Sequence, residues 1–375
     1  MFSWVEKSVS SCLGPLKNCV SMDDNQDLQM DDDALIWSRD LERHFRGEFS
    51  FAVVQANAVL EDQSQVQTGP HATFVGVYDG HGGTEASRYV CNNLFQHLLR
   101  LAGESRRVSE DIIRNAFSQT EEGFLNIVRR DVGIKPNMTS IGSCCLVGVF
   151  CEGTLYVANL GDSRAVLGYL GSSNKIVAEQ LTQDHNASVE AVRNELKELH
   201  PHDPQIVLQD QGVWRVKGIT QISRSIGDAH LKKTEFALNA TSNRHYLPEY
   251  VRRSVLRADP AITTRNLQPT DKFIIFASDG LWELLTNKEA VEIVHKNPRL
   301  GIAKRLLMMA MKKASKIRKT PYSDIKILPA GRQRRNIHDD ITIVVIFIDP
   351  DNTAPPQVSV RGFVNNVGQP DFIFE

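Results

Sequence analysis

The sequence predicts an α+β protein in which antiparallel sheets are covered by helices. Two observations support this prediction. Short segments rich in Val, Ile and Phe are dense through the middle of the 375 residues, and such segments are typical of strands. Segments with helical periodicity fall together between runs of strands, whereas a regular alternation of strand and helix would favour a parallel sheet.

Seven segments carry the expected strands. β-branched and aromatic residues dominate them, as they do in buried strands. The seven are EFSFAVVQAN (48–57), ATFVGVYD (72–79), SIGSCCLVGVF (140–150), GTLYVANLGD (153–162), RAVLGYL (164–170), KFIIFASD (272–279) and ITIVVIFID (341–349).

Three regions between the strands have the apolar spacing of helices. They are residues 84–101, residues 109–128, which begin at a capping serine, and residues 290–311. Because the helices do not alternate with single strands, we expect them to cover the faces of antiparallel sheets.

Composition limits the function. The chain has 43 Lys and Arg against 45 Asp and Glu, a formal net charge of −2, so it lacks the positive field that holds nucleic acid. Its six cysteines show no CxxC pair, which suits reduced thiols in the cytoplasm or nucleus. No apolar run approaches the roughly 20 residues of a membrane span, and the N-terminus does not resemble a secretion signal. We therefore expect a protein that is neither secreted nor membrane-spanning.

Both ends differ from the middle of the chain. Residues 1–46 are an expected N-terminal extension, with an amphipathic helical pattern followed by an acidic linker at 21–34. The amphipathic segment would dock on the protein's own core, or would bind a membrane surface or a partner. Residues 351–375 are rich in Pro, Asn and Gly and are expected to form a tail. One folded domain is expected between them, at 47–350.

Acidic residues stand at the ends of the predicted strands. The positions are Glu61-Asp62, Asp79, Asp162, Asp279 and Asp339-Asp340. In antiparallel neighbours the end of one strand lies beside the start of the next, so these carboxylates can converge on one sheet edge. Each Asp taken alone is a common turn former. A converging cluster instead needs cations to offset its repulsion, and hard oxygen ligands suit Mg²⁺ or Mn²⁺.

Eight ordered motifs make the sequence resemble the metal-dependent protein phosphatases of type 2C. They are VLED, VYDGHGG, GSCCLVGV, LYVANLGDSRAVL, LTQDHN, ISRSIGD, IIFASDGLWE and HDDITIVV. The segments GEFSFAVVQAN and LEDQSQV place the resemblance closest to the plant branch called clade D. The resemblance implies a β-sandwich of two antiparallel sheets flanked by helix pairs, with 47–350 as the catalytic domain.

The resemblance also implies roles for particular residues. Asp79 would bridge two Mg²⁺ or Mn²⁺ ions per subunit, and Gly80 would offer its backbone carbonyl. The other ligands implied for the pair are Glu61, Asp62, Asp279 and Asp339. Asp162 and Glu283 correspond to the position of a weaker third metal. His81 resembles the general acid that protonates the departing Ser or Thr oxygen, a task suited to a group with an ordinary pKa of about 6.5.

The activity implied by the resemblance is hydrolysis of phosphoserine and phosphothreonine in proteins. A water activated by the two ions would attack phosphorus directly, so no phosphoenzyme is required. Two other functions remain open. One is a catalytically weakened, phosphatase-like binding module, and the other is a metal-dependent phosphodiesterase or nuclease, which should show a basic groove.

Three residues depart from the family pattern. The family generally has a phosphate-binding Arg four residues before the Glu of its ED pair, and here that position is Asn57. Because Asn lacks the charge of a guanidinium, the grip on phosphate should be weak unless another cation replaces it. Candidates are Arg164, Arg224 or a residue of the basic segment at 312–335. Asp340 stands where an Asn is usual, and Glu283 stands where an Asp is usual.

Two further segments bear on substrate choice. Residues 312–335 contain nine basic residues and one acid, which suits a solvated face or the attraction of phosphorylated, acidic or membrane-associated substrates. Residues 229–259 fall where the family varies in a flap beside the active site. We expect a monomeric enzyme of plant signalling in the cytoplasm or nucleus, with a peripheral position at the plasma membrane as the alternative. The resemblance to clade D implies a plasma-membrane proton pump as substrate and small auxin-induced inhibitor proteins as regulators.

Overall fold

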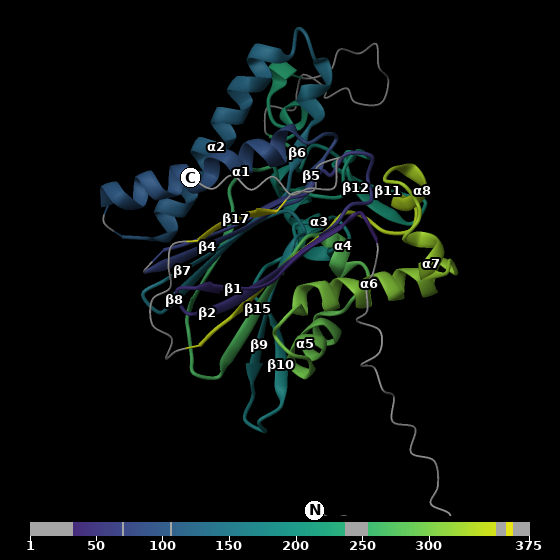
Figure 1. Ribbon diagram of the computed structural model, residues 1–375. Coiled ribbons are helices and arrows are strands. Elements are labelled where there is room, and N and C mark those ends of the chain that lie inside the picture. The colour runs from purple at the N-terminus through teal and green to yellow at the C-terminus, as the bar shows by residue number, and fades with distance from the viewer. Residues whose placement is uncertain (1–32, 70, 106, 237–253, 350–357, 363–375) are drawn as a thin grey trace, which may run out of the picture. The chain divides into compact units, whose positions relative to one another are not determined.

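Figure 1 shows the computed structural model of the chain. The structure describes residues 33–69, 71–105, 107–236, 254–349 and 358–362. The predicted amphipathic segment, nearly all of the acidic linker and most of the predicted tail lie outside the described residues. None of the helices within the described ranges is long and apolar enough to cross a membrane. The described residues from Ala34 onward belong to one compact unit, and this unit contains the fold described below.

Two six-stranded sheets form the centre of the fold, and their neighbouring strands are all antiparallel. The first sheet has the order β1 (Ile36–His44), β2 (Gly47–Val54), β16 (Ile341–Phe347), β15 (Asp271–Ala277), β9 (Arg164–Leu170) and β10 (Ile176–Gln180). The second has the order β14 (Ala261–Asn266), β8 (Thr154–Leu160), β7 (Cys145–Cys151), β4 (Ala72–Tyr78), β3 (Gln63–Thr68) and β17 (Val358–Gly362).

The sheets pack face to face because their central strands bury side chains on both sides. In β15, Ile274 and Phe276 belong to the core between the sheets. Phe273 and Ile275 point the other way and pack beneath helices, as the two-residue period of a strand requires. A strand covered on both faces is apolar throughout, which is why this segment was recognisable in the sequence.

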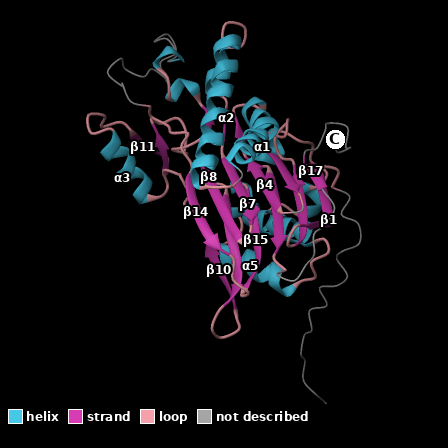
Figure 2. Ribbon diagram, turned by 90° about the vertical axis from the view of Figure 1, so that its left-hand side faces the viewer, coloured by secondary structure: helices cyan, strands magenta, loops and turns pink. Residues whose placement is uncertain are grey.

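A pair of helices covers the outer face of each sheet (Figures 1 and 2). The pairs are α1 (Glu85–Ser105) with α2 (Glu110–Asp131) on the second sheet, and α5 (Asn287–Lys296) with α6 (Ile302–Arg318) on the first. Leu94 of α1 shares a core with Phe74 of β4, and Leu306 of α6 shares one with Ile343 of β16. The predicted α+β fold, a sandwich of antiparallel sheets flanked by helix pairs, is confirmed.

The helix boundaries follow from local residues. α2 begins at the predicted cap, where the Ser109 hydroxyl accepts a hydrogen bond from the backbone N–H of Ile112. The predicted helical region at 290–311 is two helices, because Gly301 adopts a left-handed φ of 69° just before α6. Apolar spacing continues across this break, so periodicity alone did not show it.

Smaller elements lie around the sandwich. They are β5 (Gly80–His81), β6 (Gly142–Ser143), β11 (Val207–Asp210), β12 (Val213–Val216), β13 (Ile226–Gly227), α3 (Glu190–Leu199), α4 (Asp279–Trp282), α7 (Tyr322–Ile325), α8 (Arg332–Arg335), and the 3₁₀ turns η2 (Pro136–Ser140), η3 (Ala229–Leu231) and η4 (Thr234–Phe236). β5, β6 and β13 form a three-stranded sheet, and β11 pairs with β12. Most of these elements were not predicted, because they are too short to show a period.

The folded domain is wider than the predicted 47–350. β1 precedes this range and pairs with β2, while β17 follows it and pairs with β3. β1 has the sequence IWSRDLERH, and an edge strand of this kind carries charged residues instead of an apolar run. Parts of the predicted extension and tail are therefore strands of the sandwich.

Gly148 of β7 leaves room for Phe276 across the sandwich. A Cβ at residue 148 would lie 2.4 Å from the ring of Phe276. We expect Gly148→Ala to lower the free energy of unfolding by about 1–3 kcal/mol, the usual cost of overpacking a core, in chemical denaturation. Gly103→Ala in α1 is the control, since a Cβ there meets nothing within 4 Å, and it should not destabilise the protein.

A smaller side chain at residue 276 tests the cause. In a Phe276→Leu background, Gly148→Ala should cost less than in the wild type. Equal costs in the two backgrounds would contradict the steric explanation.

Candidate functional site

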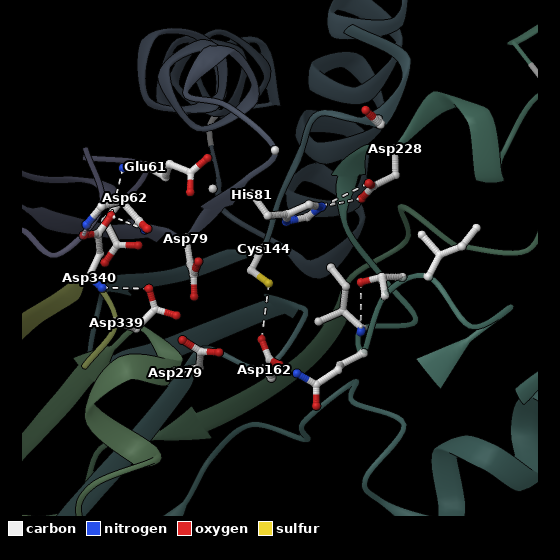
Figure 3. Close-up of a pocket in the computed structure, with 18 of the residues that line it drawn as sticks. Glu61, Asp62, Asp79, His81, Cys144, Asp162, Asp228, Asp279, Asp339 and Asp340 are labelled. Carbon is white, nitrogen blue, oxygen red and sulfur yellow. Dashed lines mark hydrogen bonds and ion pairs between the residues drawn. The ribbon is translucent and has the colours of Figure 1, made fainter. Parts of the chain in front are cut away.

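The acidic strand ends meet in one pocket of about 400 Å³ (Figure 3). Among the described residues, eight carboxylates line it, namely Glu61, Asp62, Asp79, Asp162, Asp228, Asp279, Asp339 and Asp340. Strand pairing explains the convergence, because the end of β4 lies beside the start of β3 and the end of β15 lies beside the start of β16. Asp79 and Asp279, which follow β4 and β15, are thereby brought to the residues that precede β3 and β16.

The turn after β4 needs a glycine for close approach of the backbone. A Cβ on Gly80 would lie 2.5 Å from the carbonyl oxygen of Glu61. Gly80 and His81 form β5, which pairs with β6, and Gly82 continues the turn with a left-handed φ of 73°. The functional side chains on either side of Gly80 therefore enter the same pocket.

Asp340 fixes the loop that precedes β3. Its Oδ1 accepts hydrogen bonds from the backbone N–H groups of Ala56, at 2.6 Å, and Asn57, at 3.0 Å. Its Oδ2 accepts from the backbone N–H of Glu61, at 3.0 Å, and from the side-chain amide of Asn57, at 3.1 Å. Both oxygens of this buried side chain are satisfied by protein donors. The carboxylate that stands in place of the usual Asn therefore organises the loop carrying Glu61.

Asp62 is held by the two strands beneath it. Its Oδ2 accepts hydrogen bonds from the Ser278 hydroxyl, at 2.8 Å, and from the Thr342 hydroxyl, at 2.7 Å. The Ser278 hydroxyl in turn accepts from the backbone N–H of Thr342 at 3.0 Å. This arrangement couples the position of Asp62 to the ends of β15 and β16.

Burial and mutual repulsion disfavour the charged forms of these carboxylates. Burial raises the pKa of Asp79 and of Asp279 well above the usual carboxyl range, and neighbouring carboxylates raise both further. Burial also raises the pKa of Asp339 to about 7, although the Arg335 guanidinium opposes the rise. Burial is likewise the first cause of the raised pKa of Glu61, Asp62 and Asp162. A buried oxygen-rich donor set of this kind fits Mg²⁺ or Mn²⁺.

His81 is paired with an acidic residue that the sequence analysis did not single out. Its Nε2 lies 3.0 and 2.9 Å from the two carboxylate oxygens of Asp228. Asp228 is buried and also accepts a hydrogen bond from the Ser225 hydroxyl at 2.6 Å. Burial acts to lower the pKa of His81, but the charge and hydrogen bond of Asp228 outweigh it, so the pKa lies above the ordinary value. Asp228 therefore orients His81 and favours its protonated form.

Asp162 lies in a second small cluster. Its Oδ1 is 3.3 Å from the Cys144 thiol, and its Oδ2 accepts a hydrogen bond from the Asn186 amide at 2.6 Å. Across the described ranges, Asp79, Cys144 and Asp162 form a group whose ligand atoms lie within 4.8 Å of one another. The third-metal position predicted at Asp162 thus adjoins Asp79, with Cys144 as an unpredicted neighbour.

Most of the predicted site residues line the pocket. They are Asn57, Glu61, Asp62, Asp79, Gly80, His81, Asp162, Asp279 and Asp339. Glu283 is exposed and lines a neighbouring pocket of about 110 Å³, which shares Asp339 with the main one. Residue 230, within the predicted flap, lines the main pocket, and a further group of lining residues falls within 215–222. Of this group only Ile222 belongs to a motif recognised in the sequence, ISRSIGD.

Two solved structures share this fold. A serine-threonine phosphatase 2C from Toxoplasma gondii gives a TM-score of 0.54 at 18% identity, covering 84% of this chain and 94% of that chain. A sex-determining protein of C. elegans gives a TM-score of 0.57 at 17% identity, covering 82% of this chain and 66% of that chain. At these identities the likeness establishes the fold.

The fold and the acidic pocket define a phosphatase of the metal-dependent, type 2C class. The family model described as protein phosphatase 2C matches residues 46–318. "Probable protein phosphatase 2C 43" of Oryza sativa subsp. japonica is 59% identical, covering 99% of this chain and 98% of that protein. "Probable protein phosphatase 2C 68" of Arabidopsis thaliana is 55% identical, covering 99% of each. The chain belongs to the protein phosphatase 2C family, and it is a metal-dependent protein serine/threonine phosphatase.

The repulsion among the carboxylates of the pocket predicts that Asp279→Asn changes the melting temperature differently in the absence and in the presence of metal. In EDTA, Asp279→Asn should raise the melting temperature above that of the wild type, because it removes one of the mutually repelling carboxylates. In MnCl₂, the wild type should gain more in melting temperature than the variant, because it keeps the full donor set. Differential scanning fluorimetry measures both.

Asp131→Asn at the end of α2 is the control for this experiment, since residue 131 does not line the pocket. It should leave the gain on adding MnCl₂ unchanged. Equal gains for Asp279→Asn and the wild type would exclude Asp279 as a metal ligand.

Proposed function

We propose that the acidic pocket hydrolyses phosphoserine and phosphothreonine in proteins with two Mg²⁺ or Mn²⁺ ions. The observation that carries this proposal is the convergence of eight carboxylates on one pocket that also contains His81. The proposed ligands are Glu61, Asp62, Asp79, Asp279, Asp339 and the backbone carbonyl of Gly80. Asp162, at the second cluster, is the proposed ligand of a weaker third ion. Glu283, the other residue that the resemblance implies for this ion, lines the neighbouring pocket together with Asp339.

The residues fit such ions by their chemistry. The group is rich in carboxylates, and burial raises the pKa of each proposed carboxylate ligand, so the pocket favours bound cations over bare negative charge. When bound, divalent ions at such a site lower the pKa of water and offset charge on phosphoryl oxygens. Asp340 contributes by holding the Glu61 loop, and its oxygens are already occupied by four N–H donors.

His81 is the proposed general acid for the departing seryl or threonyl oxygen. Its ring enters the pocket while its Nε2 is held by Asp228 (Figure 3). The raised pKa favours the protonated imidazole, the form that a proton donor requires. Asp228 does not touch the reacting atoms in this arrangement, and it acts as a positioning residue.

Phosphoproteins are the substrates that membership of the family implies. A plant setting is supported by the rice and Arabidopsis relatives, and a role in signalling is a further part of the proposal. A plasma-membrane proton pump as substrate, and small auxin-induced inhibitor proteins as regulators, are narrower proposals that rest on the resemblance to clade D.

Phosphopeptide hydrolysis tests the proposal directly. The wild type should release phosphate in MnCl₂ and not in EDTA. Asp79→Asn and Asp279→Asn should each abolish turnover, because each removes a charged ligand from the pocket, whereas Asp131→Asn should retain it. Near-normal turnover by both ligand variants across a metal titration would contradict the two-metal assignment. Tight phosphopeptide binding without turnover by the wild type would favour the phosphatase-like binding module.

His81→Ala should lower kcat more for substrates with a poor leaving group than for substrates with a good one. A seryl or threonyl oxygen needs a proton as it departs, whereas p-nitrophenolate does not. We therefore expect a large loss of kcat on a phosphopeptide and a small loss on p-nitrophenyl phosphate. Asp228→Asn removes the charge that His81 is paired with and keeps the shape of the side chain. It should change the ratio of the two kcat values, phosphopeptide to p-nitrophenyl phosphate, less than His81→Ala does. Equal losses on both substrates would mean that His81 positions metal ligands instead.

A further inference from the structure

The amide of Asn57 is not free to replace an arginine at the phosphate. Its side chain donates to Asp340 Oδ2 at 3.1 Å, and its backbone N–H donates to Asp340 Oδ1 at 3.0 Å. An anion entering a pocket with eight carboxylates needs compensating positive charge. A cation from another part of the chain must therefore help to bind the substrate's phosphoryl group.

Two arginines of the described part of the chain line the pocket, Arg215 and Arg335. Arg164 does not line it and pairs with Asp184, at 2.6 Å. Arg224 does not line it either and pairs with Glu195, at 3.0 Å. Both arginines named in the sequence analysis are therefore engaged elsewhere.

Arg335 is attached to the loop that carries Asn57. It is the last residue of α8, and the backbone N–H of Gly331, at the start of this helix, donates to the carbonyl oxygen of Ala56 at 2.7 Å. The neighbouring Arg334 is fully buried and donates to the carbonyl oxygens of Ile325 and Leu328, at 3.1 and 3.3 Å. These contacts fix α8 beside the position where the family has its arginine.

The Arg335 guanidinium lies at the metal-ligand side of the pocket. It forms an ion pair with Asp339, and 46% of its side chain remains exposed. A guanidinium has five N–H donors, so one carboxylate leaves donors for a phosphoryl oxygen. Arg215 lies in β12 instead, and its guanidinium donates to the carbonyl oxygen of Ile219 at 3.1 Å.

We infer that Arg335 binds the phosphoryl group of the substrate in place of the arginine that Asn57 lacks. The inference rests on the proposed function for the identity of the substrate, but not for the binding of phosphate. The contact stabilises bound substrate and transition state alike, so it acts on KM more than on kcat. The family has its phosphate-binding positive charge at residue 57, in the loop before β3. In this chain the charge comes from Arg335, in the basic segment at 312–335.

Variants within α8 give the first test. At saturating MnCl₂, Arg335→Ala should raise KM for a phosphopeptide about 10- to 100-fold, the effect of losing a charge-assisted contact, with a smaller change in kcat. Arg335→Lys should recover part of the loss, because it restores charge without the planar fork. Arg332→Ala removes the same charge from an exposed residue of the same helix that does not line the pocket. It should leave KM within about twofold of the wild type.

Direct binding separates this inference from the proposed function. Inorganic phosphate is titrated calorimetrically into the Mn²⁺-loaded wild type, Arg332→Ala and Arg335→Ala. Weaker phosphate binding by Arg335→Ala alone supports the inference even if no phosphopeptide is hydrolysed. Normal hydrolysis with unchanged phosphate affinity and KM in Arg335→Ala overturns the inference and leaves the proposed function intact.

A purely structural role for Arg335 has its own signature. If the guanidinium only positions Asp339, Arg335→Ala raises the MnCl₂ concentration needed for half-maximal activity and leaves KM at saturating metal unchanged. That result overturns the inference.

Moving the charge gives the second test. Asn57→Arg alone places a guanidinium against Asp340. The Asp340 carboxylate and the substrate's phosphate then compete for that guanidinium. Asn57→Arg with Asp340→Asn reproduces the pair usual in the family. Added to Arg335→Ala, this double change should lower KM back toward the wild-type value. If the double change folds, as judged by an unchanged melting temperature, and KM stays high, the phosphate does not lie between these positions and the inference fails.

Discussion

The repulsion among buried carboxylates at one end of the sandwich is the constraint on which the rest of this structure depends. Protein donors satisfy some of these groups: Asp340 accepts four N–H bonds, and Asp62 accepts two hydroxyls. Asp79 and Asp279 differ, because the leading influences on their pKa are burial and other carboxylates, all acting in the same direction. The acidic residues of the pocket therefore fall into two groups. Asp340 and Asp62 are bonded to protein donors and position the loop before β3, whereas the charges of Asp79 and Asp279 need cations to offset them.

Much of this site could be predicted because its acids occupy strand ends. In an antiparallel sheet, residues that follow one strand lie beside residues that precede its neighbour, so apolar runs and their flanking acids already imply convergence. Most interior strands were visible because a strand covered on both faces is usually apolar throughout. The interior strand β3 was missed, since its sequence, QSQVQT, is polar although the strand is largely buried. The edge strands β1 and β17 were also missed, because β1 carries charged residues instead of an apolar run and β17 is short.

The parts that were not predicted depend on contacts between distant segments. Asp228 follows a short strand, β13, and only the pairing of β13 and β5 with the same partner, β6, brings it to His81. Arg335 was one of nine basic residues in its segment. Its neighbour Arg334 is fully buried, so a run of positive charge that suggests a solvated face in the sequence contains one structural residue and one that lines the pocket. No local period or motif distinguishes these two.

The two departures from the family pattern, Asn57 and Asp340, depend on each other. Asp340 needs N–H donors for both oxygens, and residue 57 supplies two of the four. An arginine at residue 57 would be attracted to this carboxylate at close range, and the same guanidinium cannot serve a phosphate equally well. A carboxylate at residue 340 therefore removes the advantage of an arginine at residue 57. It also gives the loop a fixed shape, onto which Gly331 and the helix bearing Arg335 can dock. The same hydrogen bonds that take residue 57 away from the substrate thereby prepare the position from which another cation reaches it.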